Sequence, residues 1–317
     1  MLAPHDSDVM LQILLFAGTS SILEVGYVLS FHIINVKKPT TGGLSAVVKN
    51  YSNLPNFEAI QRLNAGDLVF AYLVGLIEGD GWFSVTKNGK SIKYEFGIEM
   101  NIRDIQLLYK IKENLGVGTI EIREINQRKT CIYRIRNKSH LKSIVLPIFD
   151  KYPMFSNKQY DYLMFKDLLL NEVHFSKDLS DYVRPIDPLN SIDSILDKSY
   201  FKPWLIGFIE AEGCFSIYKP AKDDSKVASF EVSQINGSIL IEAIRKEFSL
   251  SPNVFQDKTN GFKLKVSSVR AVENVVKYMQ QAPLKLMGNK KLQYLLWLKE
   301  LHNIPRYQNK FNIPDKY

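Results

Sequence analysis

Four carboxylates stand in matching pairs in this sequence, two residues apart in each pair. They close the stretches Leu73-Val-Gly-Leu-Ile-Glu-Gly-Asp-Gly81 and Leu205-Ile-Gly-Phe-Ile-Glu-Ala-Glu-Gly213. If the stretches are helical, the acids face the negative end of the helix macrodipole, which is unfavourable by about 0.3–1 kcal/mol at exposed sites. Because this unfavourable placement occurs twice, we infer that a cation binds where the two stretches end.

The segments that position these acids are predicted to be two buried helices that pack against each other. The runs Leu68–Ile77 and Trp204–Ile209 are apolar on nearly every side, which indicates burial. Small residues at every fourth position would let the two helix backbones approach closely. These small residues are Gly75, Gly79, Gly207 and Ala211.

The chain contains an internal duplication. The segment Phe83-Ser-Val85 is repeated as Phe215-Ser-Ile217, and the pattern around it recurs in the same order. The interval from Asp80 to Lys158 is 78 residues, and the interval from Glu212 to Lys290 is also 78 residues. An ordered set of matches with equal spacing indicates two copies of one structural unit.

Each copy reads as a helix, two strands, a helix, two strands and further helices. We therefore predict an α+β fold, a pseudo-twofold duplication of αββαββα halves, each with an antiparallel four-stranded sheet that has one face free. Asn88-Gly89 predicts a two-residue hairpin turn in the first sheet. The predicted boundaries are 65–170 and 199–317 for the halves and 171–198 for the linker.

Residues 1–64 differ from the rest and are expected to be an N-terminal extension and linker. The apolar run Val9–Val36 is long enough to span a bilayer, but Glu24 near its middle would be costly there. A leader, an extension and a membrane anchor all remain open, and we favour the extension.

The charge of the chain points to a polyanionic partner. The net charge is +8, and the charges of residues 1–64 sum to zero, so the excess lies in the duplicated part. Basic and polar side chains on the free sheet faces would suit DNA phosphates and base edges, although ordinary solvated strands would look similar. The candidate DNA-binding residues are Ser84, Thr86, Lys90, Lys93, Glu95, Arg123, Arg134, Arg136, Tyr218, Lys263 and Lys265.

The two acid-ended stretches and the matched lysines resemble the LAGLIDADG homing endonucleases of the single-chain, two-motif type. The likeness runs from about Ala65 to Tyr317. The stretches Tyr152–Asp161 and Gly288–Trp297 are similar to the endonuclease–maturases of group I introns in mitochondrial cytochrome b genes. The resemblance implies a DNA-binding saddle formed by the two sheets and cleavage of double-stranded DNA at a specific site.

The resemblance also assigns roles to individual residues. The final acids, Asp80 and Glu212, would bind divalent metal, and Mg²⁺ suits a few carboxylates completed by water and phosphate oxygens. Lys158 and Lys290 match the basic position near each scissile phosphate. Gln234 matches a position that organises active-site water.

Three neighbours of these residues depart from the expected catalytic pattern. Met100 stands in the first half where Gln234 stands in the second, so the halves are expected to differ in chemistry or cleavage rate. Glu78 and Glu210 lie about 200° round the helix from the final acids, and we expect them to support structure.

The expected partners are double-stranded DNA and the RNA of a group I intron, with one chain acting as a monomer and no small-molecule substrate. The resemblance places such a protein in the mitochondrion. The alternative from a different class is an RNA-binding splicing maturase with little or no nuclease activity. A protein anchored in a membrane through Val9–Val36 is the third reading.

Overall fold

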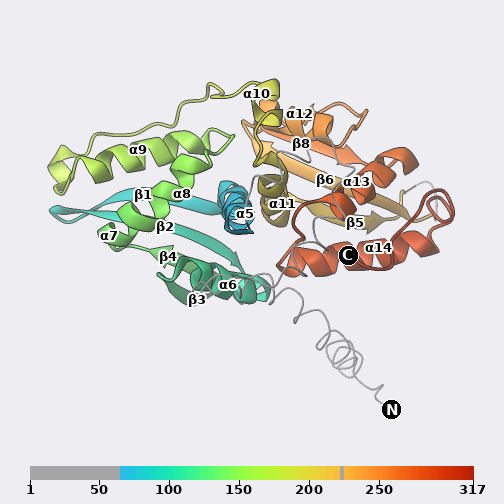
Figure 1. Cartoon of the computed structure of the whole chain (residues 1–317), viewed down its shortest axis with the longest axis horizontal. Helices are drawn as coiled ribbons and strands as arrows, with labels where there is room; N and C mark the ends of the chain where they lie inside the picture. The colour runs from blue at the N-terminus through green and yellow to red at the C-terminus, as the bar shows by residue number, and fades with distance from the viewer. Residues whose placement is uncertain (1–64, 222–224) are drawn as a thin grey trace, which may run out of the picture. The chain divides into compact units, whose positions relative to one another are not determined.

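The computed structural model describes residues 65–221 and 225–317, which form two halves of the same design (Figure 1). The first half consists of α5 (Ala65–Asp80), β1 (Gly81–Asn88), β2 (Ser91–Asn101), α6 (Ile105–Leu115), β3 (Thr119–Ile125), β4 (Arg128–Ile135), α7 (Lys138–His140), α8 (Leu146–Lys151) and α9 (Lys158–Leu170). The second half consists of α11 (Phe201–Glu212), β5 (Cys214–Tyr218), β6 (Val227–Ile235), α12 (Ser238–Glu247), β7 (Phe255–Gln256), β8 (Gly261–Val266), α13 (Val269–Gln281) and α14 (Asn289–Asn303). Between the halves, the linker contains α10 (Ile192–Leu196).

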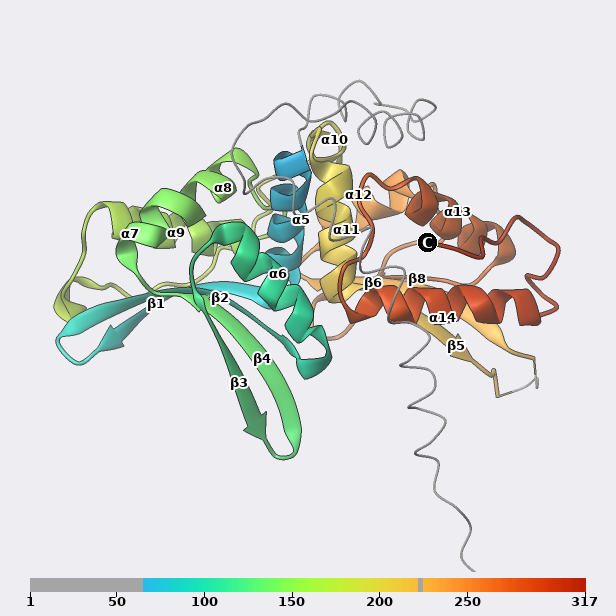
Figure 2. The same ribbon diagram turned by 60° about the horizontal axis from the view of Figure 1, so that its bottom comes forward.

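The two sheets have the same topology, which confirms the predicted fold. The strand order is β1-β2-β4-β3 in the first sheet and β5-β6-β8-β7 in the second, and all neighbours are antiparallel. The pairing of Phe83 with Phe96 in the first sheet is repeated by Phe215 with Phe230 in the second. Figure 2 shows the helices of each half on one face of its sheet, with the opposite face free of described elements.

Aromatic side chains fill the space between each sheet and its long helix. In the first half the Phe83 ring lies 5.1 Å from Tyr162 and 5.4 Å from Phe165. In the second half the Phe215 ring lies 4.8 Å from Tyr294 and 5.4 Å from Trp297. Aromatic pairs at such distances stabilise a core beyond the area that they bury, and here they fix α9 and α14 on their sheets.

Helices α5 and α11 lie side by side and join the halves (Figures 1 and 2). A Cβ atom built on Gly75 would lie 1.9 Å from the carbonyl oxygen of Trp204, and one built on Gly207 would lie 1.9 Å from that of Tyr72. A Cβ on Gly79 would lie 2.3 Å from that of Ala211. The two backbones are therefore in direct contact, and no side chain larger than a hydrogen fits at Gly75 or Gly207.

The first hairpin turn lies one residue later than the sequence predicts. Asn88 is the last residue of β1 and pairs with Ser91, so the turn residues are Gly89 and Lys90. Gly89 has a φ of +59°, which glycine adopts without strain. The register is set by the inward-facing aromatic residues of the two strands, and they determine where the turn falls.

The N-terminal extension and its Val9–Val36 run lie outside the described residues. Across residues 65–221 and 225–317, no helix is both long and apolar enough to cross a membrane.

Candidate active site at the ends of the motif helices

Glu78 in α5 is buried and connects three segments of the chain. It accepts hydrogen bonds from the backbone N–H groups of Phe155, at 3.0 Å, and of Ser156. It also accepts one from the indole Nε1 of Trp204 in α11, at 2.9 Å. Glu78 therefore fixes the loop that leads to Lys158 and ties it to the opposite motif helix.

Glu210 in α11 has the equivalent role in the second half. It accepts hydrogen bonds from the N–H of Met287, at 2.7 Å, and from the hydroxyl of Tyr72 in α5, at 3.0 Å. Met287 lies 132 residues after Phe155, as Glu210 lies 132 residues after Glu78. Burial raises the pKa of both glutamates, and the hydrogen bonds that they accept act in the opposite direction. Both side chains are structural, and each caps a loop.

The final acids come together where the two helices end. Asp80 is the last residue of α5 and Glu212 is the last residue of α11. Burial raises the pKa of Glu212 to about 7, and the nearby charge of Asp80 is the second cause. Burial also raises the pKa of Asp80. Two half-buried carboxylates that repel each other thus share one site.

The donor set fits a divalent cation of the Mg²⁺ type. Within residues 65–221 and 225–317, no third His, Cys, Asp or Glu joins Asp80 and Glu212 to make a closed metal cage. The mutual repulsion of two buried carboxylates is the kind that a cation between them would relieve. Mg²⁺ keeps several waters and takes few protein carboxylates, so the remaining positions would be filled by water and phosphate oxygens.

Lys158 lies beside the acids, and its ammonium group is fully engaged. It donates hydrogen bonds to the carbonyl oxygens of Ile77 at 3.0 Å, Gly79 at 3.0 Å and Gly81 at 2.7 Å. The carbonyls of Ile77 and Gly79 belong to the last turn of α5 and that of Gly81 to the first residue of β1, next to the helix end where the macrodipole is negative and a cation is favourable. Burial lowers the pKa of Lys158, whereas the charges of nearby acids, Glu78 foremost, raise it.

Lys290 reaches the same acids from the second half but is held differently. Its charge lowers the pKa of Asp80 and of Glu212, as the charge of Lys158 does. In the described part of the chain, its ammonium group makes no hydrogen bond and no ion pair. The structure therefore brings Asp80, Glu212, Lys158 and Lys290 together, with one lysine bound to backbone and the other unbound.

Asp104 is a further acid of this region that the sequence analysis missed. It ends the short turn Ile102–Asp104 before α6 and accepts a hydrogen bond from the N–H of Asn289 in the other half, at 2.6 Å. Its charge raises the pKa of Asp80. Asp104 belongs to no sequence motif, and only its position just before a helix could have singled it out.

Gln234 and Met100 occupy equivalent strand positions, one in each half. Both face the helix side of their sheets, since Gln234 alternates with Phe230 on β6 and Met100 with Phe96 on β2. Met100 is buried in the core, whereas Gln234 is half-buried near the start of α12. A thioether in the core cannot organise water, so the two positions differ in burial and polarity, and a difference in cleavage rate stays a prediction.

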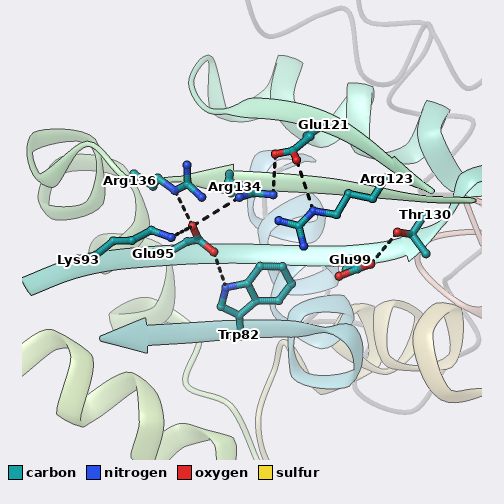
Figure 3. A network of polar contacts seen from close by, with 9 residues as sticks. All are labelled: Trp82, Lys93, Glu95, Glu99, Glu121, Arg123, Thr130, Arg134 and Arg136. Atoms are coloured by element: carbon teal, nitrogen blue, oxygen red, sulfur yellow. Dashed lines mark hydrogen bonds and ion pairs between the residues drawn. The ribbon is translucent and has the colours of Figure 1, made fainter. Parts of the chain in front are cut away.

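The free face of the first sheet carries a charged network centred on Glu95 (Figure 3). Its carboxylate lies 3.0 Å from Lys93, 2.5 Å from Arg136 and 3.8 Å from Arg134. The indole of Trp82 donates a hydrogen bond to it at 3.3 Å. These ion pairs lower the pKa of Glu95, although burial acts in the opposite direction as the largest single cause.

A second acid, Glu121, extends the network across the sheet (Figure 3). It lies 2.8 Å from Arg134 and 3.4 Å from Arg123. Arg134 as a whole residue is only 5% exposed, and its Nε has no hydrogen-bond partner among the described residues. Arg134 Nη2 is close to Glu121, but its N–H groups are not aligned for a hydrogen bond. The Nε and Nη2 donors of Arg134 therefore have no acceptor among the described residues.

The remaining candidates are placed as follows. Ser84 and Thr86 share the free face of the first sheet, and Lys90 is exposed in the hairpin turn. In the second sheet, Glu231 lies 2.9 Å from Lys263 and 3.6 Å from Lys265. The ammonium of Lys265 is also 5.2 Å from the centre of the Tyr218 ring.

This arrangement defines a class of protein in which two equivalent halves share one acidic site at a helix seam. The family model described as LAGLIDADG endonuclease matches residues 73–169 and 205–301. The chain belongs to the LAGLIDADG endonuclease family.

Relatives from fungi and a slime mould are similar over most of the chain. The probable intron-encoded endonuclease Cox1-I1b of Schizosaccharomyces pombe is 32% identical over 256 residues, which cover 73% of this chain and 63% of that protein. The probable intron-encoded endonuclease aI3 of Dictyostelium citrinum is 28% identical over 231 residues, covering 69% of this chain and 89% of that protein. This chain therefore spans less than two thirds of the length of Cox1-I1b.

Solved structures share the fold. The meganuclease I-SmaMI bound to uncleaveable DNA has a TM-score of 0.61 and 22% identity, covering 77% of this chain and 96% of that chain. I-SmaMI bound to uncleaved DNA in the presence of calcium ions also has a TM-score of 0.61 and 22% identity, covering 78% and 96%. The homing endonuclease I-GzeII in complex with its DNA target has a TM-score of 0.59 and 20% identity, covering 77% and 98%.

Proposed function

We propose that this protein is a site-specific double-strand DNA endonuclease that acts in intron homing. The observation that carries the proposal is the site shared by Asp80 and Glu212, where two repelling carboxylates and two lysines meet at the helix seam. Membership of the LAGLIDADG endonuclease family supports the same reaction. A single chain contains both copies of the site elements, so it acts as a monomer on a long target with two half-sites.

Asp80 and Glu212 are the residues that would hold Mg²⁺. When bound, the ion lowers the pKa of a water molecule and stabilises the leaving 3′ oxygen. The chain itself contributes the geometry, since Glu78 and Glu210 fix the loops and the seam fixes the acids. Lys158 and Lys290 supply positive charge for the phosphate that is attacked, one on each strand. Gln234 orders solvent in the second half. Met100, the equivalent residue in the first half, cannot do this.

The free faces of the two sheets are the proposed DNA surface. Glu95 and Glu121 hold arginine side chains in place before DNA arrives, which limits the entropy lost on binding. The half-exposed guanidinium groups of Arg123 and Arg136 are suited to the acceptor pair of a guanine in the major groove, whereas the unused donors of Arg134 are buried. Lys263, Lys265 and Tyr218 would make the corresponding contacts in the second half-site.

The direct test is cleavage of intronless mitochondrial gene fragments with Mg²⁺. Fragments of cox1 and of the cytochrome b gene should both be offered, because the relatives are named for cox1 and two stretches of this chain resemble cytochrome b maturases. The fragment that is cut identifies the host gene, and a mitochondrial location follows from it.

The first prediction concerns the two acids. Asp80→Asn and Glu212→Gln each keep the side-chain volume and remove the metal-binding charge, so cleavage should fall at least ~100-fold while DNA binding persists. Gel-shift affinity and single-turnover cleavage measure the two properties separately. As a control, Glu113→Gln removes an exposed carboxylate from α6 and should change neither. Cleavage by either acid variant at the wild-type rate would contradict the assignment.

A maturase that assists splicing of its group I intron is the second candidate. Its RNA surface would consist of the basic residues Arg245, Lys246, Arg270, Lys277 and Lys285. Two of them form close ion pairs, since Arg245 lies 2.6 Å from Glu242 and Lys277 lies 2.6 Å from Glu273. The acids and lysines at the helix seam support DNA cleavage, and no comparable site supports splicing, so DNA cleavage is the better supported function among the described residues. Splicing of the host intron with and without the protein tests the maturase function.

A further inference from the structure

The lysine loops, residues 152–157 before Lys158 and residues 282–288 before Lys290, lead into α9 and α14. The first backbone N–H groups of these two helices have different acceptors. In the first half, the hydroxyl of Ser156 accepts a hydrogen bond from the N–H of Lys158, at 3.3 Å, at the start of α9. The equivalent residue in the second half is Gly288, which has no side chain to do this. The start of α14 therefore needs an acceptor from elsewhere.

Asp104 supplies an acceptor from the opposite half of the molecule, for the amide just before Lys290 rather than for that of Lys290 itself. Its Oδ1 accepts the N–H of Asn289, the first residue of α14, at 2.6 Å. A Cβ on Gly288 would lie 2.5 Å from this oxygen and 2.8 Å from Oε1 of Glu210, so a larger residue here would displace these carboxylates. An acid at a helix N-terminus is favourable both as a cap and by its charge.

The same carboxylate lies within electrostatic reach of Lys290. Burial raises the pKa of Asp104, and Asn289 and Lys290 act in the opposite direction. Lys158 needs no such partner, because the carbonyls of Ile77, Gly79 and Gly81 bind its ammonium group. Lys290 makes no hydrogen bond in the described part of the chain, so its position depends on its loop and on nearby charge.

We propose that Asp104 is a positioning residue for Lys290: it caps α14 across the seam and holds Lys290 against the acidic site. The inference rests on the proposed nuclease function. The residue comes from the first half and acts on the lysine of the second, so correct placement of Lys290 requires both halves to be folded and docked. The equivalent position in the second half is Ser238, so this link runs in one direction only.

The test compares strand-specific cleavage by Asp104→Ala, Asp104→Asn and Lys290→Met on a target labelled separately at each 5′ end. Asp104→Ala should slow, at least ~10-fold, the same strand that Lys290→Met slows, and leave the other strand near the wild-type rate. Asp104→Asn keeps the acceptor oxygen and should recover most of this loss. Glu113→Ala, on the exposed side of α6, is the matched control and should leave the strand ratio unchanged.

A second measurement does not depend on catalysis. Hydrogen–deuterium exchange at the amide of Asn289 should become at least ~10-fold faster in Asp104→Ala, and stay slow in Asp104→Asn and in Glu113→Ala. Equal slowing of both strands, slowing of the opposite strand, or unchanged exchange at Asn289 would each overturn the proposal. If the wild type cuts neither strand, the nuclease function fails, and the exchange measurement still decides whether Asp104 holds the loop.

Discussion

The loop before Lys158 and the loop before Lys290 follow equivalent helices, yet different parts of the molecule hold them. The inter-half linker packs on the first loop, where Asn157 donates to the carbonyl of Pro185 at 2.9 Å and Asn190 donates to that of Phe155 at 3.3 Å. The second loop is held by Asp104 and by the hydroxyl of Tyr317, which accepts the N–H of Leu286 at 3.0 Å.

This difference separates what the two copies must share from what they need not share. The glycines of the seam and the capping glutamates recur at an interval of 132 residues, because each copy touches the other through them. The lysine loops contact different neighbours, one the linker and the other the end of the chain. Apart from the backbone amides that Glu78 and Glu210 bind, each loop could therefore change without disturbing the seam, and the two lysines acquired different surroundings.

The largest effect is expected where the halves are most alike. Gly75→Ala and Gly207→Ala would each drive a methyl group into a backbone carbonyl, because the Cβ position lies 1.9 Å from it in both cases. Overpacking of this kind should lower the free energy of unfolding by about 3 kcal/mol or more. Denaturant unfolding of both variants checks the value. Because the contacts are equivalent, a loss confined to one glycine would show that the seam is not symmetric.

Much of this similarity could be predicted from the sequence alone. Apolar runs with small residues four apart predict the buried helices, and the repeated Phe83 and Phe215 segments predict two sheets of one design. Such features depend on local periodicity and on repetition, which are visible along the chain. The same reasoning finds Asp80 and Glu212, because acids at the ends of buried helices are out of place.

The contacts that distinguish the halves were not predictable in this way. Asp104 and Asn289 are 185 residues apart, and Asp104 belongs to no repeated motif. The pairing of Glu95 with its basic neighbours also depends on the strand register, which the sequence analysis placed one residue off at the hairpin turn. Long-range polar contacts have no periodic signal, so they become visible only when the sheets and helices are docked.

The next prediction contrasts the two lysines directly. Lys158→Met leaves the carbonyls of Ile77, Gly79 and Gly81 without their donor and should lower the free energy of unfolding by about 1–3 kcal/mol. Lys290→Met removes no hydrogen bond and should change it by less than about 0.5 kcal/mol. In cleavage, each variant should slow one strand by about 10²-fold and accumulate nicked DNA. Thermal unfolding and strand-specific labelling measure the two effects. Equal loss on both strands would argue against one lysine for each strand.

The smallest predicted effect is that of Lys285, which lies within the second loop and has Pro153 as its equivalent in the first. Its ammonium donates to the carbonyls of Met279, at 3.0 Å, and Gln280, at 2.8 Å, at the end of α13. Burial lowers the pKa of Lys285 from 10.5 to about 8. Between pH 8 and 10.5 the unfolded chain therefore holds a proton here that the folded chain has lost, so the contribution of Lys285 to stability rises with pH.

Relative to Lys285→Met, which does not titrate, the wild type should gain about 1 kcal/mol in unfolding free energy between pH 8 and pH 9. Comparison of the two proteins cancels the titration of the tyrosines and of other groups that they share. Denaturant unfolding at both pH values measures the gain. A difference between the two proteins that stays constant or shrinks over this range would mean that Lys285 remains charged when folded. Lys285 would then be a charged lysine that caps the C-terminal end of α13, as Lys158 caps the C-terminal end of α5.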